Sequence, residues 1–347
     1  MSATSKTTAL WRGFGSIVFA ILGSTFLSGT LVHPIDLPAL VEGCDLIVVG
    51  RVTSISETQA RRASQPAASA PVEILEGTLA IDALLKGELE GRIVLFEFLK
   101  SGAPGAIRPV PQGQYGIFFL RGKGTSYALA DPLYPFLPAV PNGHFVSGPS
   151  LDQVVAKLGE ILAEANSTDE ELASALDALG STPGTFATET LRHALKATSG
   201  QRQLRIASRL VSRNDMTGLD IVETNLRQPG QLPDELHAVL AGSLAGLNDP
   251  KAIPALQRLL KTNDQQIARW AVVALRQTHS ADALEPLSQL LTNSDAWVRY
   301  HAVVGLGEIT GQDEWTPAFD EFRQNEAKYL SHWRDWAATN LPPGTPH

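Results

Sequence analysis

The chain has 347 residues, of which 44% are hydrophobic and 18% are charged, and its formal net charge at pH 7 is −8. This composition describes a folded protein, excludes an intrinsically disordered one, and at this length predicts more than one domain. Residues 1–149 are neutral overall, whereas residues 150–347 contain 17 basic and 25 acidic side chains, so the second part carries the whole excess. That acidity argues against nucleic-acid binding, which depends on a basic surface.

An apolar segment near the N-terminus predicts export. Lys6 and Arg12 precede an uncharged stretch from Gly13 to Val32, which is the layout of a secretory signal. We therefore expect residues 1–30 to be a signal peptide and the mature protein to be periplasmic or secreted. The alternative is an uncleaved membrane anchor, since about 20 residues can span a bilayer. Membrane association is expected only in that second case.

Residues 33–148 have the pattern of an all-β domain. Short segments rich in Val, Ile, Leu and Phe alternate with glycine-containing turns, and they cover residues 45–55, 79–85, 92–99, 115–120 and 126–130. Five or six short strands with few helices predict a small barrel or sandwich. The Ala-, Ser- and Pro-rich stretch 57–71 predicts a long loop between the first two strands. Cys44 is the single cysteine, so no intramolecular disulfide can form, and we expect a buried thiol.

The strand segments of this domain also suggest a family. Their order, with CDLIVVGRVTSI at 44–55, ALLKG at 83–87 and GQYGIFFL at 113–120, is similar to the oligonucleotide/oligosaccharide-binding (OB) type barrel of the netrin and TIMP group. The resemblance implies an OB-like barrel. Inhibition in the TIMP proteins depends on an N-terminal cysteine at the zinc of a metalloprotease and on disulfides, whereas Cys44 is internal and alone. A protease-inhibitor-like barrel is kept as an alternative function.

Residues 150–341 have a helical pattern with an internal repeat. Eight positions recur at an offset of 31 residues, namely Leu256/Leu287, Leu259/Leu290, Leu260/Leu291, Asp264/Asp295, Ala271/Ala302, Val272/Val303, Val273/Val304 and Leu275/Leu306. A fixed period of this size is typical of a solenoid, whose units bury their apolar faces against one another. We expect five to six helical pairs, the last of them formed by residues 317–322 and 327–341. The predicted fold is therefore a small OB-like β-barrel followed by an all-α solenoid.

The best-defined unit carries a recognisable motif. It has the pattern D-x-x-V-R-x-x-A-V-x-x-L-x-x-I, formed by Asp295, Val298, Arg299, Ala302, Val303, Leu306 and Ile309. This unit resembles HEAT repeats of the short type found in phycobilisome-lyase-like proteins. The resemblance implies that Asp264, Asp295 and Arg299 are structural and that Asp and Arg form a ladder between stacked units. Ala268 occupies the Arg position of the preceding unit and Arg269 comes one residue later, so we expect the ladder to be interrupted.

Two groups of side chains in the solenoid are candidates for partner binding. Arg202, Arg205, Arg209 and Arg213 are spaced to lie on one side of a helix, where they form either a docking patch for an acidic partner or a solvated face paired with acidic neighbours. Trp270, Trp297 and Tyr300 form the second group, because aromatic residues are enriched at binding hot spots. Packing within or between repeats is the alternative for these three.

The sequence offers little that points to catalysis. The eight histidines do not have the spacing of a zinc site, and there is no nucleophile elbow, phosphate loop or dinucleotide fingerprint. We therefore predict no catalytic residue, no metal and no cofactor. The predicted function is that of an exported, non-catalytic scaffold or adaptor that binds a protein partner through its solenoid. The further alternative is an accessory or lyase-like enzyme component that acts on a bound cofactor or protein.

Overall fold

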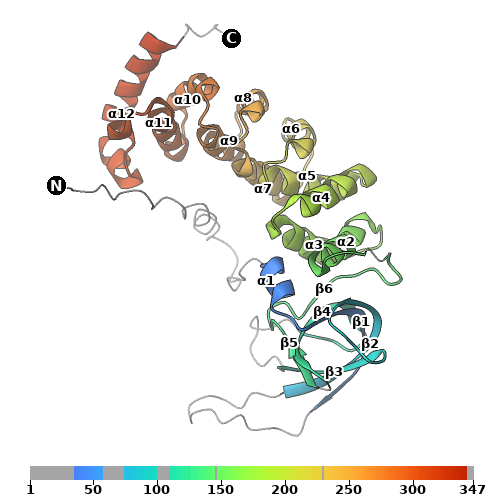
Figure 1. The fold of residues 1–347 in the computed structure, drawn as a ribbon. Coiled ribbons are helices and arrows are strands. Elements are labelled where there is room, and N and C mark those ends of the chain that lie inside the picture. Colours follow the sequence, from blue (N-terminus) through green and yellow to red (C-terminus); the bar gives the residue numbers. More distant parts are fainter. Residues whose placement is uncertain are drawn as a thin grey trace, which may run out of the picture.

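The structure is a computed structural model that describes residues 35–57, 74–99, 109–124, 126–144, 147–228 and 230–341. The predicted signal or anchor over residues 1–30 lies outside the described residues. A β-barrel stands at one end of the molecule, and a curved stack of helices leads away from it (Figure 1). Within the described ranges, none of the helices is long and apolar enough to cross a membrane.

The N-terminal part is a closed five-stranded barrel. It is preceded by the short helix α1 (Leu37–Glu42), and its elements are β1 (Leu46–Glu57), β2 (Ile74–Lys86), β3 (Ile93–Leu99), β4 (Tyr115–Lys123) and β5 (Ser126–Leu129), with the two-residue β6 (Phe136–Leu137) added to β4. The strands are paired in the order β1-β2-β3-β5-β4, and β4 pairs with β1 to close the barrel. Strands β3 and β5 are parallel, and all other pairs are antiparallel. The predicted OB-like barrel is therefore present.

The first five residues of strand β1 (Leu46–Gly50) are buried on both faces of the strand. Leu46 and Val48 point into the barrel and join the core inside it, whereas Ile47 and Val49 point outward and join the core shared with the helices. A strand that is covered on both sides reads as a continuous apolar run instead of an alternating one. The stretch Leu46–Val49 in the sequence is such a run, and its cause is the helix packing on the outside of the barrel.

A β-bulge in β2 helps to build the same junction. Gly50 pairs with Ile81 and its neighbour Val49 pairs with Ala83, so one step along β1 corresponds to two along β2. The extra residue reverses the direction of the side chains that follow it. Ile81 therefore faces the barrel interior, whereas Ala83 faces the helices.

The second part is a stack of helices. Its members are α2 (Ser150–Ala163), α3 (Asp169–Ser181), α4 (Thr185–Ala197), α5 (Gly200–Ser212), α6 (Leu219–Leu226), α7 (Asp234–Ser243), α8 (Ile253–Leu260), α9 (Gln265–Gln277), α10 (Leu284–Gln289), α11 (Ala296–Thr310) and α12 (Phe319–Asn340). Helices α7, α9 and α11 lie on the inner side of the curve, and α6, α8 and α10 lie on its outer side (Figure 1). The predicted closing pair corresponds to α12, in which two helical segments meet at a kink where Asn325 has non-helical backbone angles.

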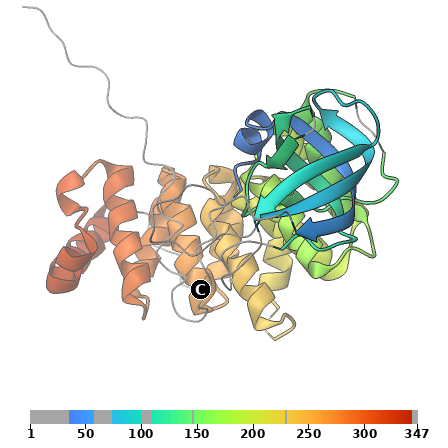
Figure 2. The ribbon, with the colours of Figure 1, turned by 90° about the horizontal axis from the view of Figure 1, so that it is seen from below.

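The barrel and the stack share one hydrophobic core. It runs from α1 and the outer face of the barrel through α2 to Trp333 in α12. The Ser181 hydroxyl at the end of α3 also donates a hydrogen bond of 2.7 Å to the carbonyl of Ile35, which precedes α1. Figure 2, seen from below, shows the barrel packed against one end of the stack, with α12 at the other. The barrel therefore covers the end of the stack that would otherwise face water.

Cys44 is buried beside α1, as the sequence predicts. Its Sγ donates to the carbonyl of Leu40 at 2.9 Å. Burial raises the pKa of the thiol to about 11, which leaves Cys44 protonated and unreactive at neutral pH.

Candidate functional site

The second helices of the stack are joined by a ladder of polar pairs. His237 in α7 lies with its Nε2 3.3 Å from Oδ2 of Asp264, which precedes α9. Arg269 in α9 pairs with Asp295, which precedes α11, and Arg299 in α11 pairs with Glu326 in α12. The interruption expected at Ala268 does not occur, because the guanidinium of the next residue, Arg269, reaches Asp295. The ladder thus continues from α7 to α12.

Asp295 has two roles in this ladder. Its carboxylate caps α11 by accepting the backbone N–H of Trp297 at 2.9 Å, and it also accepts a hydrogen bond from Arg269. Burial alone would raise the pKa of Asp295, but hydrogen bonds from Arg269, the N–H of Trp297 and Gln265 outweigh burial and lower it. Asp264 caps α9 in the same way, accepting the N–H of Ile267 at 3.0 Å. In both cases an N-cap side chain satisfies a free N–H of the helix.

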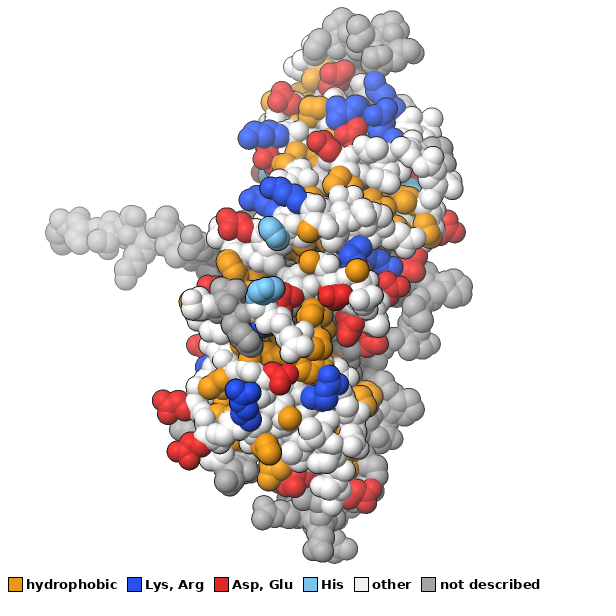
Figure 3. Space-filling view, turned by 90° about the vertical axis from the view of Figure 1, so that its right-hand side faces the viewer, with side chains coloured by type: hydrophobic (Ala, Val, Ile, Leu, Met, Phe, Trp, Pro, Cys, Tyr) orange, Lys and Arg blue, Asp and Glu red, His pale blue; other side chains and the backbone are white. Residues whose placement is uncertain are grey.

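Further ion pairs connect neighbouring units. Arg258 in α8 holds Glu223 in α6 through two hydrogen bonds of 2.6 and 2.7 Å. Arg276 in α9 holds Glu308 in α11 through two of 2.6 Å. Such two-point pairs fix orientation as well as distance. The side of the molecule seen in Figure 3 also mixes basic and acidic side chains, without a large area of one sign.

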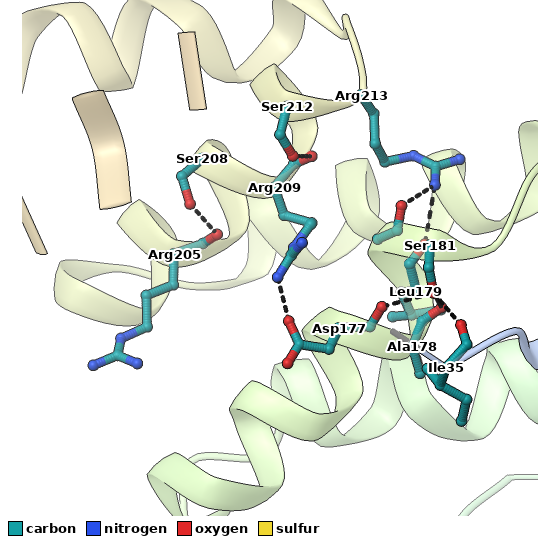
Figure 4. Close-up of polar contacts among 11 residues, drawn as sticks. Ile35, Asp177, Ala178, Leu179, Ser181, Arg205, Ser208, Arg209, Ser212 and Arg213 are labelled. Atoms are coloured by element: carbon teal, nitrogen blue, oxygen red, sulfur yellow. Dashed lines mark hydrogen bonds and ion pairs between the residues drawn. The ribbon is translucent and has the colours of Figure 1, made fainter. Parts of the chain in front are cut away.

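Two of the four arginines on α5 close the ends of other helices. Arg202 donates to the carbonyl of Glu164 at 2.7 Å and to the Ser167 hydroxyl at 2.7 Å, beyond the end of α2. Arg213 donates to the carbonyl of Leu179 at 3.1 Å (Figure 4). It also donates to the carbonyls of Gly180 and Thr182 at 2.8 and 2.7 Å, at the end of α3. The last carbonyls of a helix lack partners within it, and a basic side chain can supply them. Both arginines therefore have an internal structural role.

The other two arginines of α5 differ from each other. Arg209 forms an ion pair with Asp177 in α3. The guanidinium of Arg205 points away from the residues drawn beside it (Figure 4). Within the part of the chain that the structure describes, no hydrogen bond or ion pair of this guanidinium is found. The stripe read from the sequence is thus three internally bonded arginines and one unpaired arginine.

The aromatic candidates are placed in two environments. The rings of Trp297 and Tyr300 pack against Phe319, the first residue of α12, with ring centroids 5.5 and 5.1 Å apart. Trp270 is half-buried on α9, and its Nε1 lies 4.0 Å from the position that a Cβ on Gly242 of α7 would occupy. Trp297 and Tyr300 therefore contact the terminal helix, whereas Trp270 spans two units on the inner side of the stack.

His301 occupies the repeat position of Trp270 one unit later. Its side chain is 8% exposed, and Nδ1 lies 3.2 Å from Nη1 of Arg276. Burial and the nearby Arg276 lower the pKa of His301 to about 3. His301 is therefore neutral at pH 7, with its ring packed edge-on to Trp297 at 4.3 Å between centroids.

A polar cleft lies at the turns between two adjacent units. Its volume is 530 Å³, and it is lined by the ends of α8 and α10 and by the turns that precede α9 and α11, including Asn263 and Asp264. In the described ranges, no group of three or more His, Cys, Asp or Glu side chains is arranged to hold a metal ion.

Comparison with protein families agrees with the geometry. The family model described as HEAT repeats matches residues 231–307 and, again, residues 262–330. Residues 231–330 of the helical region therefore contain HEAT repeats. This class of array is a helical-repeat scaffold for protein interaction. Among curated proteins, no match is found.

Among solved structures, one similar chain is the crystal structure of an engineered protein. It is 19% identical, the alignment covers 47% of this chain and 91% of that one, and the TM-score is 0.27.

Proposed function

We propose that this protein is an exported, non-catalytic scaffold that binds a partner protein through the inner face of its HEAT-repeat array. The HEAT-repeat match together with the ladder is the observation that carries the proposal. The ladder holds α7, α9, α11 and α12 in a fixed arrangement and uses the chain's own polar groups at the turns. A pre-ordered array of this kind presents a long surface without an ordering cost on binding.

The inner face offers groups that suit protein binding. Val239 on α7 is 45% exposed, and the indole of Trp270 on α9 is half-buried nearby. Tryptophan and arginine in partly desolvated positions dominate the binding energy of many interfaces. The inner helices α7 and α9 therefore form the candidate contact surface.

The proposal is tested by affinity purification of the full chain from the extracytoplasmic fraction of its source, with mass spectrometry as the readout. A double variant, Val239→Glu with Trp270→Ala, alters the inner face, and Lys261→Glu alters the turn edge as a matched control. We expect a partner that wild type and the control retain and the double variant loses. If all three proteins recover the partner equally, the partner does not bind through the inner face.

Export is tested separately by mass spectrometry of the mature protein. Loss of about 30 residues supports a cleaved signal. An intact N-terminus in the membrane fraction supports the anchor, and an intact N-terminus in the cytosol contradicts export.

A further inference from the structure

The position of Arg299 in α11 is occupied by an alanine one unit earlier. Arg299 donates from Nη1 to the carbonyls of Asn293 and Ser294, in the turn before its own helix, at 2.7 and 2.9 Å. Its Nε donates to the carboxylate of Glu326. The residue 31 positions earlier is Ala268 in α9, whose methyl group makes no hydrogen bond. The unit formed by α8 and α9 therefore lacks the guanidinium that holds the turn of the next unit.

The turn carbonyls of this earlier unit have no donor in the chain. At the 31-residue offset, Thr262 and Asn263 are the equivalents of Asn293 and Ser294. Among the described residues, no hydrogen bond to the carbonyl oxygen of Thr262 or Asn263 is found. Arg269 forms the ion pair to the next unit but makes no bond to its own turn. Thr262 is half-buried and Asn263 is exposed, so a donor from another molecule can reach this turn.

The polar cleft between the two units lies beside the same turn. Ala268 and Asn263 line it from one unit, and Glu285 and Gln289 of α10 line it from the next. Its volume of 530 Å³ is within the range of about 300–1,000 Å³ that is usual for ligand sites. The cleft thus opens both onto the alanine that replaces the arginine and onto the turn that lacks a donor.

The charges that line the cleft favour a cation. The ionisable side chains among its lining residues are Lys261, Asp264 and Glu285. The carboxylate of Asp264 is engaged by its helix cap and by His237. Glu285 forms no ion pair within the described ranges, and its carboxylate accepts only a long hydrogen bond of 3.4 Å, from Gln289. Two carboxylates against one ammonium leave the lining net negative, in a part of the chain that is acidic overall.

We propose that this cleft binds an arginine side chain of another protein. The guanidinium donates to the carbonyls of Thr262 and Asn263, as Arg299 does to the equivalent turn, and Glu285 supplies the counter-charge. Arginine suits the site better than lysine, because its planar guanidinium donates to several acceptors in a fixed geometry. The lining includes neither of the inner-face side chains that the purification test alters. This second contact site therefore does not depend on the inner face of the scaffold.

The test uses a displayed library of short random peptides, selected on the full-length protein. Enriched peptides are synthesised, together with versions in which arginine is replaced by citrulline, which keeps the shape of the side chain and removes its charge. Their Kd values are measured by fluorescence polarisation. The proteins are wild type, Ala268→Arg, Glu285→Gln, Lys261→Glu and the control Ala327→Arg, which adds an arginine at an exposed alanine of α12. Circular dichroism confirms that each variant is folded.

The variant Ala268→Arg supplies the missing guanidinium from within the chain. We expect it to keep or raise the Tm and to weaken peptide binding by at least about 10-fold, because its side chain occupies the cleft. Replacing the peptide arginine by citrulline weakens binding to wild type by about 10-fold, as for charge-assisted hydrogen bonds of modest strength. Glu285→Gln also weakens binding, Lys261→Glu strengthens it, and Ala327→Arg leaves it unchanged.

Enriched peptides without arginine, or arginine peptides that bind Ala268→Arg as tightly as wild type, would overturn the inference. Failure to enrich any peptide also counts against it. If Ala268→Arg does not fold, Glu285→Gln and Lys261→Glu must still change the Kd in opposite directions, and equal Kd values for these two variants refute the site. The scaffold function is judged independently, by the purification with the Val239 and Trp270 double variant.

Discussion

Asp295 provides the sharpest test of how the repeat units are held together. It caps α11 through the N–H of Trp297 and also joins α11 to α9 through Arg269. Asp295→Ala removes both interactions. Asp295→Asn keeps a good N-cap but removes the charge, since Asn and Asp cap helices about equally well. Comparing the two variants therefore separates the stabilisation due to the N-cap from that due to the ion pair with Arg269.

The expected magnitudes follow from exposure. Loss of an N-cap costs about 1 kcal/mol. The ion pair contributes about 0.5 kcal/mol, because the Arg269 side chain is 53% exposed and solvent screens it. We therefore expect Asp295→Ala to lower the free energy of unfolding by about 1.5 kcal/mol, and Asp295→Asn by about 0.5 kcal/mol. Adding Arg269→Gln to Asp295→Asn should cost little more, because both remove the same pair.

The assay is urea unfolding at pH 7, followed by tryptophan fluorescence and by circular dichroism. Coincident transitions from the two probes show whether a single free energy describes the unfolding of this array. Hydrogen exchange of the first turn of α11 gives a local reading in the same proteins. If Asp295→Asn is as damaging as Asp295→Ala, or if the Ala variant costs less than about 0.3 kcal/mol, the assignment of the cap as the larger contribution is wrong.

Three further predictions concern other parts of the molecule. Val49→Asp, which buries a charge between barrel and helices, should lower stability by at least about 3 kcal/mol, whereas Leu95→Asp on the open side of the barrel costs about 1 kcal/mol or less in the same urea assay. Glu308→Gln, which weakens the two-point pair with Arg276, should cost about 1 kcal/mol and loosen α11 in hydrogen exchange. Burial would raise the pKa of Asp215, but hydrogen bonds from Thr217 and Arg192 lower it below its usual 3.8. The ionised Asp215 therefore contributes its full stabilisation above about pH 3.8, and this stabilisation is lost as the pH falls further and the carboxylate is protonated. We expect Asp215→Asn to make the fall in Tm between pH 5 and pH 2 less steep.

The repeat was readable from the sequence because it rests on local patterns. The 31-residue offset, the acid before each second helix and the apolar helical stripe are all visible in α8 to α11. The barrel was also predictable as short β-rich segments. Strand β2 begins at Ile74, five residues before the predicted start at residue 79. The earlier start was missed because Glu76 and Gly77 are of types disfavoured in strands. Helix α1 was not predicted, although Asp36 and Pro38 are a typical helix start.

The roles of the four α5 arginines could not be read from their spacing. All four share one side of the helix, and only the tertiary structure determines which carbonyls or acids lie within reach of each guanidinium. Arg202 and Arg213 meet the ends of α2 and α3, Arg209 meets Asp177, and the guanidinium of Arg205 points away from the residues drawn beside it (Figure 4). The Arg269 rung was likewise missed, because a shift of one residue along the helix is compensated by a long, flexible side chain.

Because the barrel packs against the first helices, only the α12 end of the array is uncovered within the part of the chain that the structure describes. In a repeat stack, each unit is stabilised by its neighbours, so fraying starts where a neighbour is missing. At the α2 end the barrel packs where a neighbouring unit would pack. At the other end, no further helix follows α12 among the described residues. We therefore expect opening to spread from α12 toward the barrel, with amide protection rising in the same direction. The α7–α9 surface lies closer to the barrel than α12 does, so we expect it to stay folded when the α12 end opens.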